Sequence, residues 1–348
     1  MGSGCENCPG PIGDPDSVPG VELAVLDHEE VLRPKWDLKE IPSQLGRIAL
    51  VTGANNPDGI GFHVAHQLAL KGAKVYVGAR SCEKANAAIR DMLHKSPELD
   101  AALIAPFAAD MGNVRDVQRA SRALTLQENR LDILVNNAAV VSTPFRKNSD
   151  GIAVSFATNH LGTFVLTKML TPLLIETGRA HAEPPRIINV ASTSHHAVPQ
   201  GTTFSSLEDF NNSFGNLGSF LSKFLRYGYS KLANILHLKE LQRRLDGNGA
   251  NVLAMSVHPT TGVTNAMIRH QGGADGEPVR LEPSPLDGAT TILYAAAHPE
   301  PKQDRIKFAG SFIMPFGCVN EPSEDAQNPD LARQLWETTE SVLGNIMI

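Results

Sequence analysis

The chain has 348 residues, of which 42% are hydrophobic and 20% are charged. This composition is typical of globular proteins and excludes collagen-like and wholly disordered chains. Its four cysteines are too few for a disulfide framework, and nothing resembles a secretory signal, so the sequence favours a reducing, cytoplasmic compartment. The longest apolar stretch, residues 164–175, is interrupted by Lys168, and we therefore expect no membrane span.

The formal net charge of −6 comes from the first 45 residues, which hold nine acidic and three basic side chains. The other 303 residues carry 28 charges of each sign, which gives no electrostatic reason to expect nucleic acid as a partner. The acidic segment also contains six prolines and five glycines without sustained periodicity. It predicts an extended arm, residues 1–45, ahead of a folded domain, residues 46–348.

From residue 47 onward, short apolar runs alternate with longer segments of helical periodicity. The apolar runs lack polar alternation, which is typical of strands buried on both faces of a parallel sheet. The pattern predicts one α/β domain, a doubly wound, mostly parallel seven-stranded sheet with helices on both faces. The expected strands are residues 47–53, 74–80, 103–110, 131–138, 186–192, 251–259 and 312–319, and the expected helices lie near residues 60–72, 83–95, 113–127, 153–176, 220–246 and 286–297.

A glycine-rich turn, TGANNPDGIG over residues 52–61, joins the first expected strand to the first expected helix. Backbone N–H groups at such a turn, beside the positive end of a helix, bind a pyrophosphate group. The strand before the motif and the helix after it favour a Rossmann-like dinucleotide site over a plain connecting turn. The candidate cofactor-binding residues of this turn are Gly53, Asn55, Gly59, Ile60 and Gly61.

The second expected strand ends in Gly78-Ala79-Arg80, without the acidic residue that would accept a hydrogen bond from a ribose 2′-hydroxyl. An arginine at this place binds a 2′-phosphate by charge and by paired hydrogen bonds. We therefore expect NADP(H) as the cofactor, with a solvated surface arginine as the alternative interpretation of Arg80.

Further motifs follow in a fixed order: Asp110-Met111, Asn136-Asn137-Ala138-Ala139, Asn159, Ser192 and the segment YGYSK over residues 227–231. Over about residues 36–320, this ordered set resembles the classical short-chain dehydrogenases/reductases, and most closely the retinol-dehydrogenase-like branch that includes many fungal oxidoreductases. The resemblance implies catalytic roles for Asn159, Ser192, Tyr227 and Lys231. It implies cofactor contacts from Asp110, Met111, Asn137, Ala138, Tyr227, Lys231, Pro259 and Thr264.

Tyr227 and Lys231 are four residues apart in a helical segment, so both side chains project from one face of the helix. A phenol exchanges protons at neutral pH only when its anion is stabilised, and a nearby ammonium group lowers its pKa in this way. Ser192, at the end of the fifth expected strand, is placed to hydrogen-bond a substrate carbonyl oxygen. The resemblance implies that Asn159 holds a water molecule linked to Lys231.

Two competing assignments are weaker. Tyr229 has an alanine rather than a lysine four residues on, and Ser194 matches the family position less well than Ser192. Three features depart from the family pattern. Five residues rather than three separate the first two glycines of the turn, Thr260 stands where glycine is usual, and Ala139 replaces the last glycine of the Asn-Asn-Ala-Gly motif.

Residues 193–226 and 260–285 are expected to flank the substrate, and the first of these segments holds five phenylalanines that either line an apolar pocket or pack within the segment. The sequence predicts an NADP(H)-dependent oxidoreductase that passes hydride between nicotinamide and a hydrophobic ketone, aldehyde or alcohol, in the manner of secondary metabolism. The alternatives are non-redox elimination or cyclisation with the same tyrosine, and a catalytically idle nucleotide-binding interaction protein. No metal-ligand constellation is evident, and a homo-oligomer, dimer or tetramer, is left open.

Overall fold

The computed structural model describes residues 37–141, 143–215, 217–259, 284–315 and 317–346. Most of the expected arm, residues 1–45, lies outside these ranges, as do Thr264 and nearly all of the expected substrate loop 260–285. The described part begins with a short 3-10 helix, η1 (Leu38–Glu40), which Asp37 caps, and Ile41 after it is buried. The chain is therefore already packed on the domain before its first strand.

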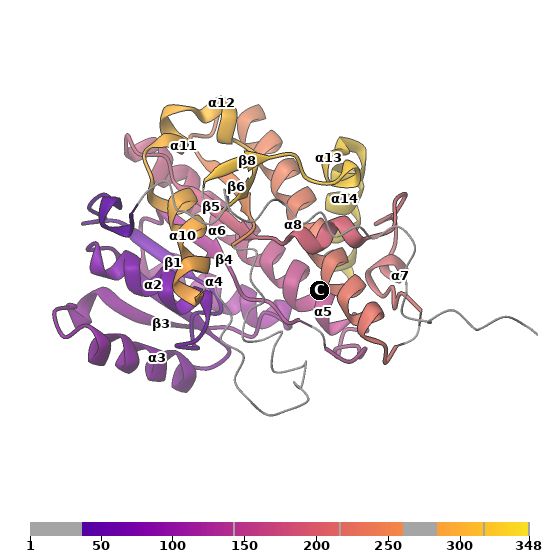
Figure 1. Cartoon of the computed structure of the whole chain (residues 1–348), viewed down its shortest axis with the longest axis horizontal. Coiled ribbons are helices and arrows are strands. Elements are labelled where there is room, and N and C mark those ends of the chain that lie inside the picture. Colours follow the sequence, from indigo (N-terminus) through magenta and orange to yellow (C-terminus); the bar gives the residue numbers. More distant parts are fainter. Residues whose placement is uncertain (1–36, 142, 216, 260–283, 316, 347–348) are drawn as a thin grey trace, which may run out of the picture. The chain divides into compact units, whose positions relative to one another are not determined.

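An eight-stranded sheet lies at the centre of the described chain (Figure 1). Its strand order is β3-β2-β1-β4-β5-β6-β7-β8, and the first seven strands along the chain run parallel. The order reverses between β1 and β4, and in open α/β sheets ligands bind at the carboxyl ends of the strands beside such a switch point. The strands are β1 (Ile48–Val51), β2 (Lys74–Ala79), β3 (Ile104–Ala108), β4 (Ile133–Asn136), β5 (Arg186–Val190), β6 (Leu253–Val257), β7 (Phe312–Met314) and β8 (Cys318–Asn320).

The expected single strand over residues 312–319 is wrong, because the chain forms a hairpin there. β7 and β8 pair antiparallel, with Phe312 opposite Asn320 and Met314 opposite Cys318. Gly317 donates its N–H to the Met314 carbonyl and has φ +85°, a conformation that favours glycine and ends the straight apolar run. The mostly parallel, doubly wound sheet is confirmed, with one antiparallel strand more than expected.

Helices cover both faces of the sheet and form two separate hydrophobic clusters. One cluster joins α2, α3 and α10 to strand residues such as Val51 and Val135, and the other joins α4, α6, α8 and α14 to residues such as Leu50 and Leu134. Neighbouring residues of a strand, such as Leu50 and Val51, thus belong to opposite clusters, because successive side chains of a strand point to opposite faces of the sheet. The longer helices are α2 (Ile60–Leu70), α3 (Cys82–Lys95), α4 (Val114–Gln127), α6 (Gly162–Ala180), α8 (Phe220–Gly247), α10 (Pro285–Ala297) and α14 (Pro329–Ile346). The shorter ones are η2 (Ala101–Leu103), α5 (Val154–Phe156), η3 (Ala157–Leu161), η4 (Thr193–Ala197), α7 (Leu207–Phe210), α11 (Glu300–Gln303), α12 (Arg305–Phe308) and α13 (Glu324–Gln327).

The C-terminal helix α14 is absent from the expected elements, although the sequence carries its signals. Asn328 accepts hydrogen bonds from the Asp330 and Leu331 N–H groups and so caps the helix start. Leu331, Leu335 and Trp336 are buried, and the helix packs against α8. Leu331, Leu335, Thr339 and Val342, all buried, are four, four and three residues apart, which is the period of an amphipathic helix and makes this helix predictable in principle.

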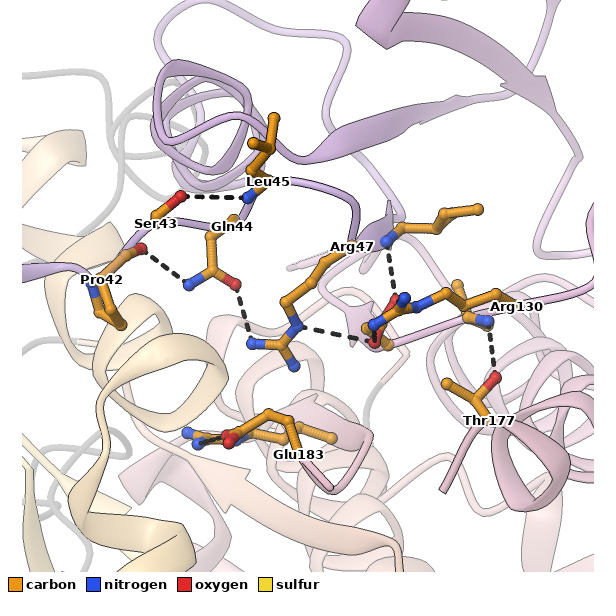
Figure 2. A network of polar contacts seen from close by, with 12 residues as sticks. Pro42, Ser43, Gln44, Leu45, Arg47, Arg130, Thr177 and Glu183 are labelled. Carbon is orange, nitrogen blue, oxygen red and sulfur yellow. Dashed lines mark hydrogen bonds and ion pairs between the residues drawn. The ribbon is translucent and has the colours of Figure 1, made fainter. Parts of the chain in front are cut away.

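A buried polar network ties together the amino ends of the central strands (Figure 2). The Asp132 carboxylate, which is fully buried, accepts hydrogen bonds from the Ile48 N–H (2.9 Å) and from Arg130 Nε (2.7 Å). Arg47 Nε lies 3.6 Å from the same carboxylate, and Arg47 Nη1 donates to Gln44 Oε1. One carboxylate thus holds β1 and the segment before β4 in register, because it accepts from both.

Replacing Asp132 with alanine should lower the free energy of unfolding by about 3–5 kcal/mol, because the substitution leaves buried arginine and N–H donors without their acceptor. Urea unfolding followed by circular dichroism measures this change. The matched control is Glu176→Ala, which removes an exposed pair with Arg179 and should cost less than about 1 kcal/mol. Equal losses for the two variants would contradict the structural role of Asp132.

Candidate active site

A cleft of about 340 Å³ opens at the carboxyl edge of the sheet, where segments that follow β1, β2, β4, β5 and β6 meet. Two of the predicted site residues, Gly61 and Asn159, are not part of its lining, and Thr264 lies outside the described residues. The predicted residues that line it are Gly53, Asn55, Gly59, Ile60, Arg80, Asp110, Met111, Asn137, Ala138, Ser192, Tyr227, Lys231 and Pro259.

Thr52 and Asn137 join the end of β1 to the end of β4 by four hydrogen bonds. Thr52 Oγ1 accepts from the N–H groups of Asn137 and Ala138, both at 3.0 Å. Asn137 Nδ2 donates to the carbonyls of Thr52 (2.9 Å) and Gly53 (3.2 Å). A Cβ atom on Gly61 would lie 2.3 Å from Asn137 Nδ2, so the glycine is required for this contact. We call this arrangement the Thr52–Asn137 clamp; it fixes the glycine-rich turn on the floor of the cleft.

The two extra residues of the glycine-rich turn lie in a hydrogen-bonded turn at the surface. Gly59 donates its N–H to the Asn56 carbonyl (2.8 Å), and Asp58 donates its N–H to Asn56 Oδ1 (3.3 Å). Residues 56–58 are exposed, and Asn56 and Asp58 lie among the residues that line the cleft. The insertion is therefore a closed surface turn, and it places one carboxylate at the edge of the cleft.

Arg80 lines the cleft from the end of β2, and its side chain is exposed. No acidic side chain in the described part of the chain forms an ion pair with it. Gly78, two residues earlier, packs against the end of β1, since a Cβ there would come 2.7 Å from Thr52 Cα. The end of β2 is thus packed closely on the end of β1, and the exposed Arg80 side chain that follows it has no acidic partner among the described residues.

Asp110 and Met111 follow β3 and lie on another side of the cleft. Asp110 Oδ1 accepts the Gly112 N–H at 2.9 Å, so this carboxylate shapes the turn after the strand. Met111 is buried, and a Cβ on Gly162 would lie 2.1 Å from its carbonyl oxygen. The start of α6 is therefore packed tightly against this part of the cleft wall.

Ser192, Tyr227 and Lys231 come together at the cleft from η4 and α8. Ser192 Oγ accepts the Ser194 N–H (3.2 Å), and the same side chain lies near enough to the Tyr227 hydroxyl to lower its pKa. Lys231 is buried, its Nζ donates to the Val190 carbonyl (2.6 Å), and it lies 5.4 Å from the centre of the Tyr227 ring. Two hydroxyl groups and one amine thus face the same space.

Burial opposes the expected effect of Lys231 on Tyr227. Burial raises the pKa of Tyr227 to about 12, and the hydrogen bond from Ser192 lowers this pKa only in part. Burial also lowers the pKa of Lys231 to about 7. Burial is thus the largest cause of both shifts and disfavours both charged forms, and the lowering of the Tyr227 pKa by an ammonium group stays a prediction.

Asn159 lies in η3, a π-helical turn of a kind that is frequent at functional sites. Its Oδ1 accepts the Val140 N–H (2.8 Å), and its Nδ2 donates to the Val140 carbonyl (3.0 Å) and to Ser230 Oγ (2.9 Å). The side chain is fully buried and fully paired. It positions Val140, which lines the cleft, against the middle of α8.

Two histidines near Ser192 received no role from the sequence. His195 Nε2 accepts the Ser323 N–H, so its proton is on Nδ1, which donates to the Ser192 carbonyl at 2.6 Å. His258 lines the cleft, its Nδ1 accepts the Thr193 N–H, and burial lowers its pKa to about 3. Both rings hold the Ser192 segment in place; the only sequence signal was their position after β5 and β6.

The described part of the chain lacks two other classes of feature. No group of three or more histidine, cysteine, aspartate or glutamate side chains is arranged to hold a metal ion there. Among the helices that the structure describes, none combines the length and the apolar character that crossing a membrane requires.

The fold and the cleft define an α/β protein with a nucleotide-type glycine turn and a Ser–Tyr–Lys cluster. Residues 47–206 match the model of the short chain dehydrogenase family. A short-chain dehydrogenase/reductase of Armillaria gallica is 40% identical over 303 residues, covering 85% of this chain and 92% of that protein. Human retinol dehydrogenase 11 is 32% identical and covers 86% of each chain.

Among solved structures, a Mycobacterium paratuberculosis protein superposes with a TM-score of 0.67 at 28% identity, covering 89% of this chain and 97% of that one. The chain belongs to the short-chain dehydrogenase/reductase family of oxidoreductases, whose members use NAD(P)(H). This confirms the family resemblance that the ordered motifs suggested.

The depressed pKa of Lys231 predicts a pH dependence of stability. Above about pH 7 the unfolded chain keeps a proton on this lysine that the folded chain has released, so the free energy of unfolding rises with pH. Between about pH 7.5 and pH 9, the free energy of unfolding of the unmodified protein should therefore rise by about 1–2 kcal/mol more than that of Lys231→Met. Urea unfolding of both proteins at several pH values measures it. A difference independent of pH would contradict the burial of this amine.

Proposed function

We propose that the protein is an NADP(H)-dependent oxidoreductase that interconverts a hydrophobic ketone or aldehyde and the corresponding alcohol. The observation that carries the proposal is the convergence of Ser192, Tyr227 and Lys231 on one cleft, beside the Thr52–Asn137 clamp. A Ser–Tyr pair of hydroxyl groups suits a carbonyl oxygen, and the clamp holds a turn suited to a pyrophosphate.

The residues of the cleft fit a nicotinamide dinucleotide. Gly53 and Gly61 let the turn pack directly on Ala138 and Asn137, where a Cβ would clash, and the backbone N–H groups at the start of α2 suit phosphate oxygens. Arg80, exposed and without an ion pair among the described residues, suits the additional 2′-phosphate of NADP(H). When bound, the cofactor supplies or accepts a hydride.

The chain's own side chains provide the proton chemistry. In reduction, Ser192 and Tyr227 donate hydrogen bonds to the carbonyl oxygen, and Tyr227 passes its proton to that oxygen as the alcohol forms. Lys231 regains its charge when an anion binds close by, because a nearby negative charge raises the pKa of an amine. The charged lysine then stabilises the tyrosinate that the proton transfer leaves behind.

The proposed substrate is hydrophobic because Val140 and Val141 line the same cleft as this cluster. We assign the reaction to secondary metabolism on the similarity to fungal members of the family such as the Armillaria gallica protein. This assignment rests on relatedness, whereas the reaction type rests on the side chains of the cleft.

Arg80→Ala should weaken NADPH binding by about 10- to 100-fold, because the variant loses a charge-assisted contact worth about 1.5–3 kcal/mol. NADH affinity should change little, since NADH has no 2′-phosphate. Isothermal titration of each nucleotide measures both affinities. The matched control is Arg122→Ala, an exposed arginine on α4 that does not line the cleft. Equal losses for both nucleotides would show that Arg80 acts on the turn rather than on the phosphate.

Tyr227→Phe should lower the turnover of a simple ketone such as acetophenone by about 10²- to 10⁴-fold, the usual contribution of a positioned acid–base group. NADPH consumption measures turnover, and nucleotide affinity should persist because the ring remains.

Tyr229→Phe is the control for this experiment. Its hydroxyl is buried two residues away and donates to the Thr203 carbonyl (2.8 Å), so its loss should cost stability rather than turnover. If Tyr229→Phe were inactive and Tyr227→Phe active, the assignment of the proton donor would be wrong. If both kept full activity, non-redox chemistry or nucleotide binding alone would become the better account.

A further inference from the structure

The phenylalanines before the catalytic tyrosine fall into two groups with different environments. Phe204 and Phe210 are buried and pack on Phe156, with ring centres 6.2 and 4.4 Å away. Packing accounts for these rings completely. Phe220 and Phe224, by contrast, belong to neither hydrophobic cluster of the described chain, and the Phe220 side chain is 56% exposed.

The register of α8 places the second group on the catalytic face. The helix begins at Phe220 and continues through Gly247. Phe220, Phe224, Tyr227 and Lys231 are separated by four, three and four residues, which is the spacing of side chains on one helix face. At 1.5 Å per residue, Phe224 lies about 4.5 Å and Phe220 about 10.5 Å along the axis from Tyr227. The two rings therefore extend the row that begins with the catalytic pair.

The two rings stack on each other and form one apolar unit. Their planes are within 13° of parallel, with centres 6.2 Å apart. The segment that follows the cleft residues Val140 and Val141 lies beside this part of the helix, since Arg226 Nη2 donates to the Thr143 carbonyl at 3.1 Å. Phe220 is exposed and Phe224 is half-buried, and neither ring lines the cleft itself, whereas Tyr227 on the same helix face does. A ligand that reaches out of the cleft past Tyr227 would meet these apolar rings.

We propose that Phe224 and Phe220 bind the apolar body of the substrate, and that the substrate is an elongated, uncharged ring compound whose carbonyl or hydroxyl carbon lies at one end. This inference rests on the proposed function, because it places the reacting carbon at Tyr227. A body of two linked rings extends from Tyr227 over Phe224 to Phe220. The first turn of α8 presents no acidic side chain, and so nothing there favours a cationic ligand.

A matched pair of ketones tests the proposal. Acetophenone has one ring, and 4-acetylbiphenyl adds a second ring at the end away from the carbonyl. The unmodified protein should have the higher kcat/KM for 4-acetylbiphenyl. Phe224→Ala should reduce the ratio of the two kcat/KM values by about tenfold, because stacking and burial of the second ring are lost. Phe220→Ala should reduce it by a smaller factor, since that ring lies farther from the carbonyl.

Leu221→Ala is the control, because this leucine is 41% exposed and neighbours Phe220 but lies about 100° around the helix. It should leave the ratio unchanged. An unchanged ratio in Phe224→Ala would overturn the proposal, as would a ratio in the unmodified protein that shows no preference for the second ring.

A binding measurement separates this proposal from the proposed function. In the presence of NADPH, equilibrium dialysis should show that the Tyr227→Phe protein binds 4-acetylbiphenyl more tightly than acetophenone. Adding Phe224→Ala should lower the ratio of the two affinities by about tenfold. If neither ketone turns over but this preference is found, the reaction type fails and the binding surface stands. If Phe220→Asp instead changes the sedimentation coefficient without affecting ketone affinity, the face is an interface between copies, and the proposal is wrong.

Discussion

The Thr52–Asn137 clamp is the constraint on which the site depends, because it joins two strands that lie on either side of the switch point of the sheet. Four hydrogen bonds hold the end of β1 against the end of β4. They leave no space for a side chain at Gly61, and the glycine turn consequently adopts one course along the cleft floor. The opposite end of the same strands is tied by Asp132, so β1 and β4 are fixed at both ends. A site built on such strands has little freedom to shift when a ligand binds.

The side chains proposed to be catalytic are largely withdrawn from solvent, Lys231 almost fully and Tyr227 in part, which gives the cleft its chemical character. Burial raises the pKa of Tyr227 and lowers the pKa of Lys231, so the ionised form of each group is disfavoured. A negative charge placed nearby favours the protonated lysine, and that ammonium in turn favours the tyrosinate. The proton chemistry of the proposed reaction is therefore coupled to anion binding in the cleft. If the substrate binds without an anion in the cleft, Lys231 is less often charged, and Tyr227 keeps a high pKa.

Much of the fold and of the site follows from the sequence, since apolar runs and motif order depend on local patterns. The expectation of one strand over residues 312–319 is wrong because a glycine with positive φ turns this apolar run into a hairpin. The apolar run alone does not reveal the turn. The partners of Asn159 come from segments 19 and 71 positions away, and no local pattern identifies them. The pKa shift of Tyr227 depends on burial, which spacing alone does not report. The two groups of phenylalanines likewise separate only once the helix start at Phe220 is known.

The central claim, hydride transfer to a carbonyl carbon in this cleft, is tested most directly by isotope transfer. The protein is incubated with 4-acetylbiphenyl and NADPH that carries deuterium at the reactive position of nicotinamide C4, and the alcohol is examined by mass spectrometry and NMR. The account predicts one deuterium on the carbinol carbon from one stereoisomer of the labelled cofactor and none from the other. An alcohol without deuterium from either stereoisomer, or no alcohol from a protein that binds both compounds, would contradict it.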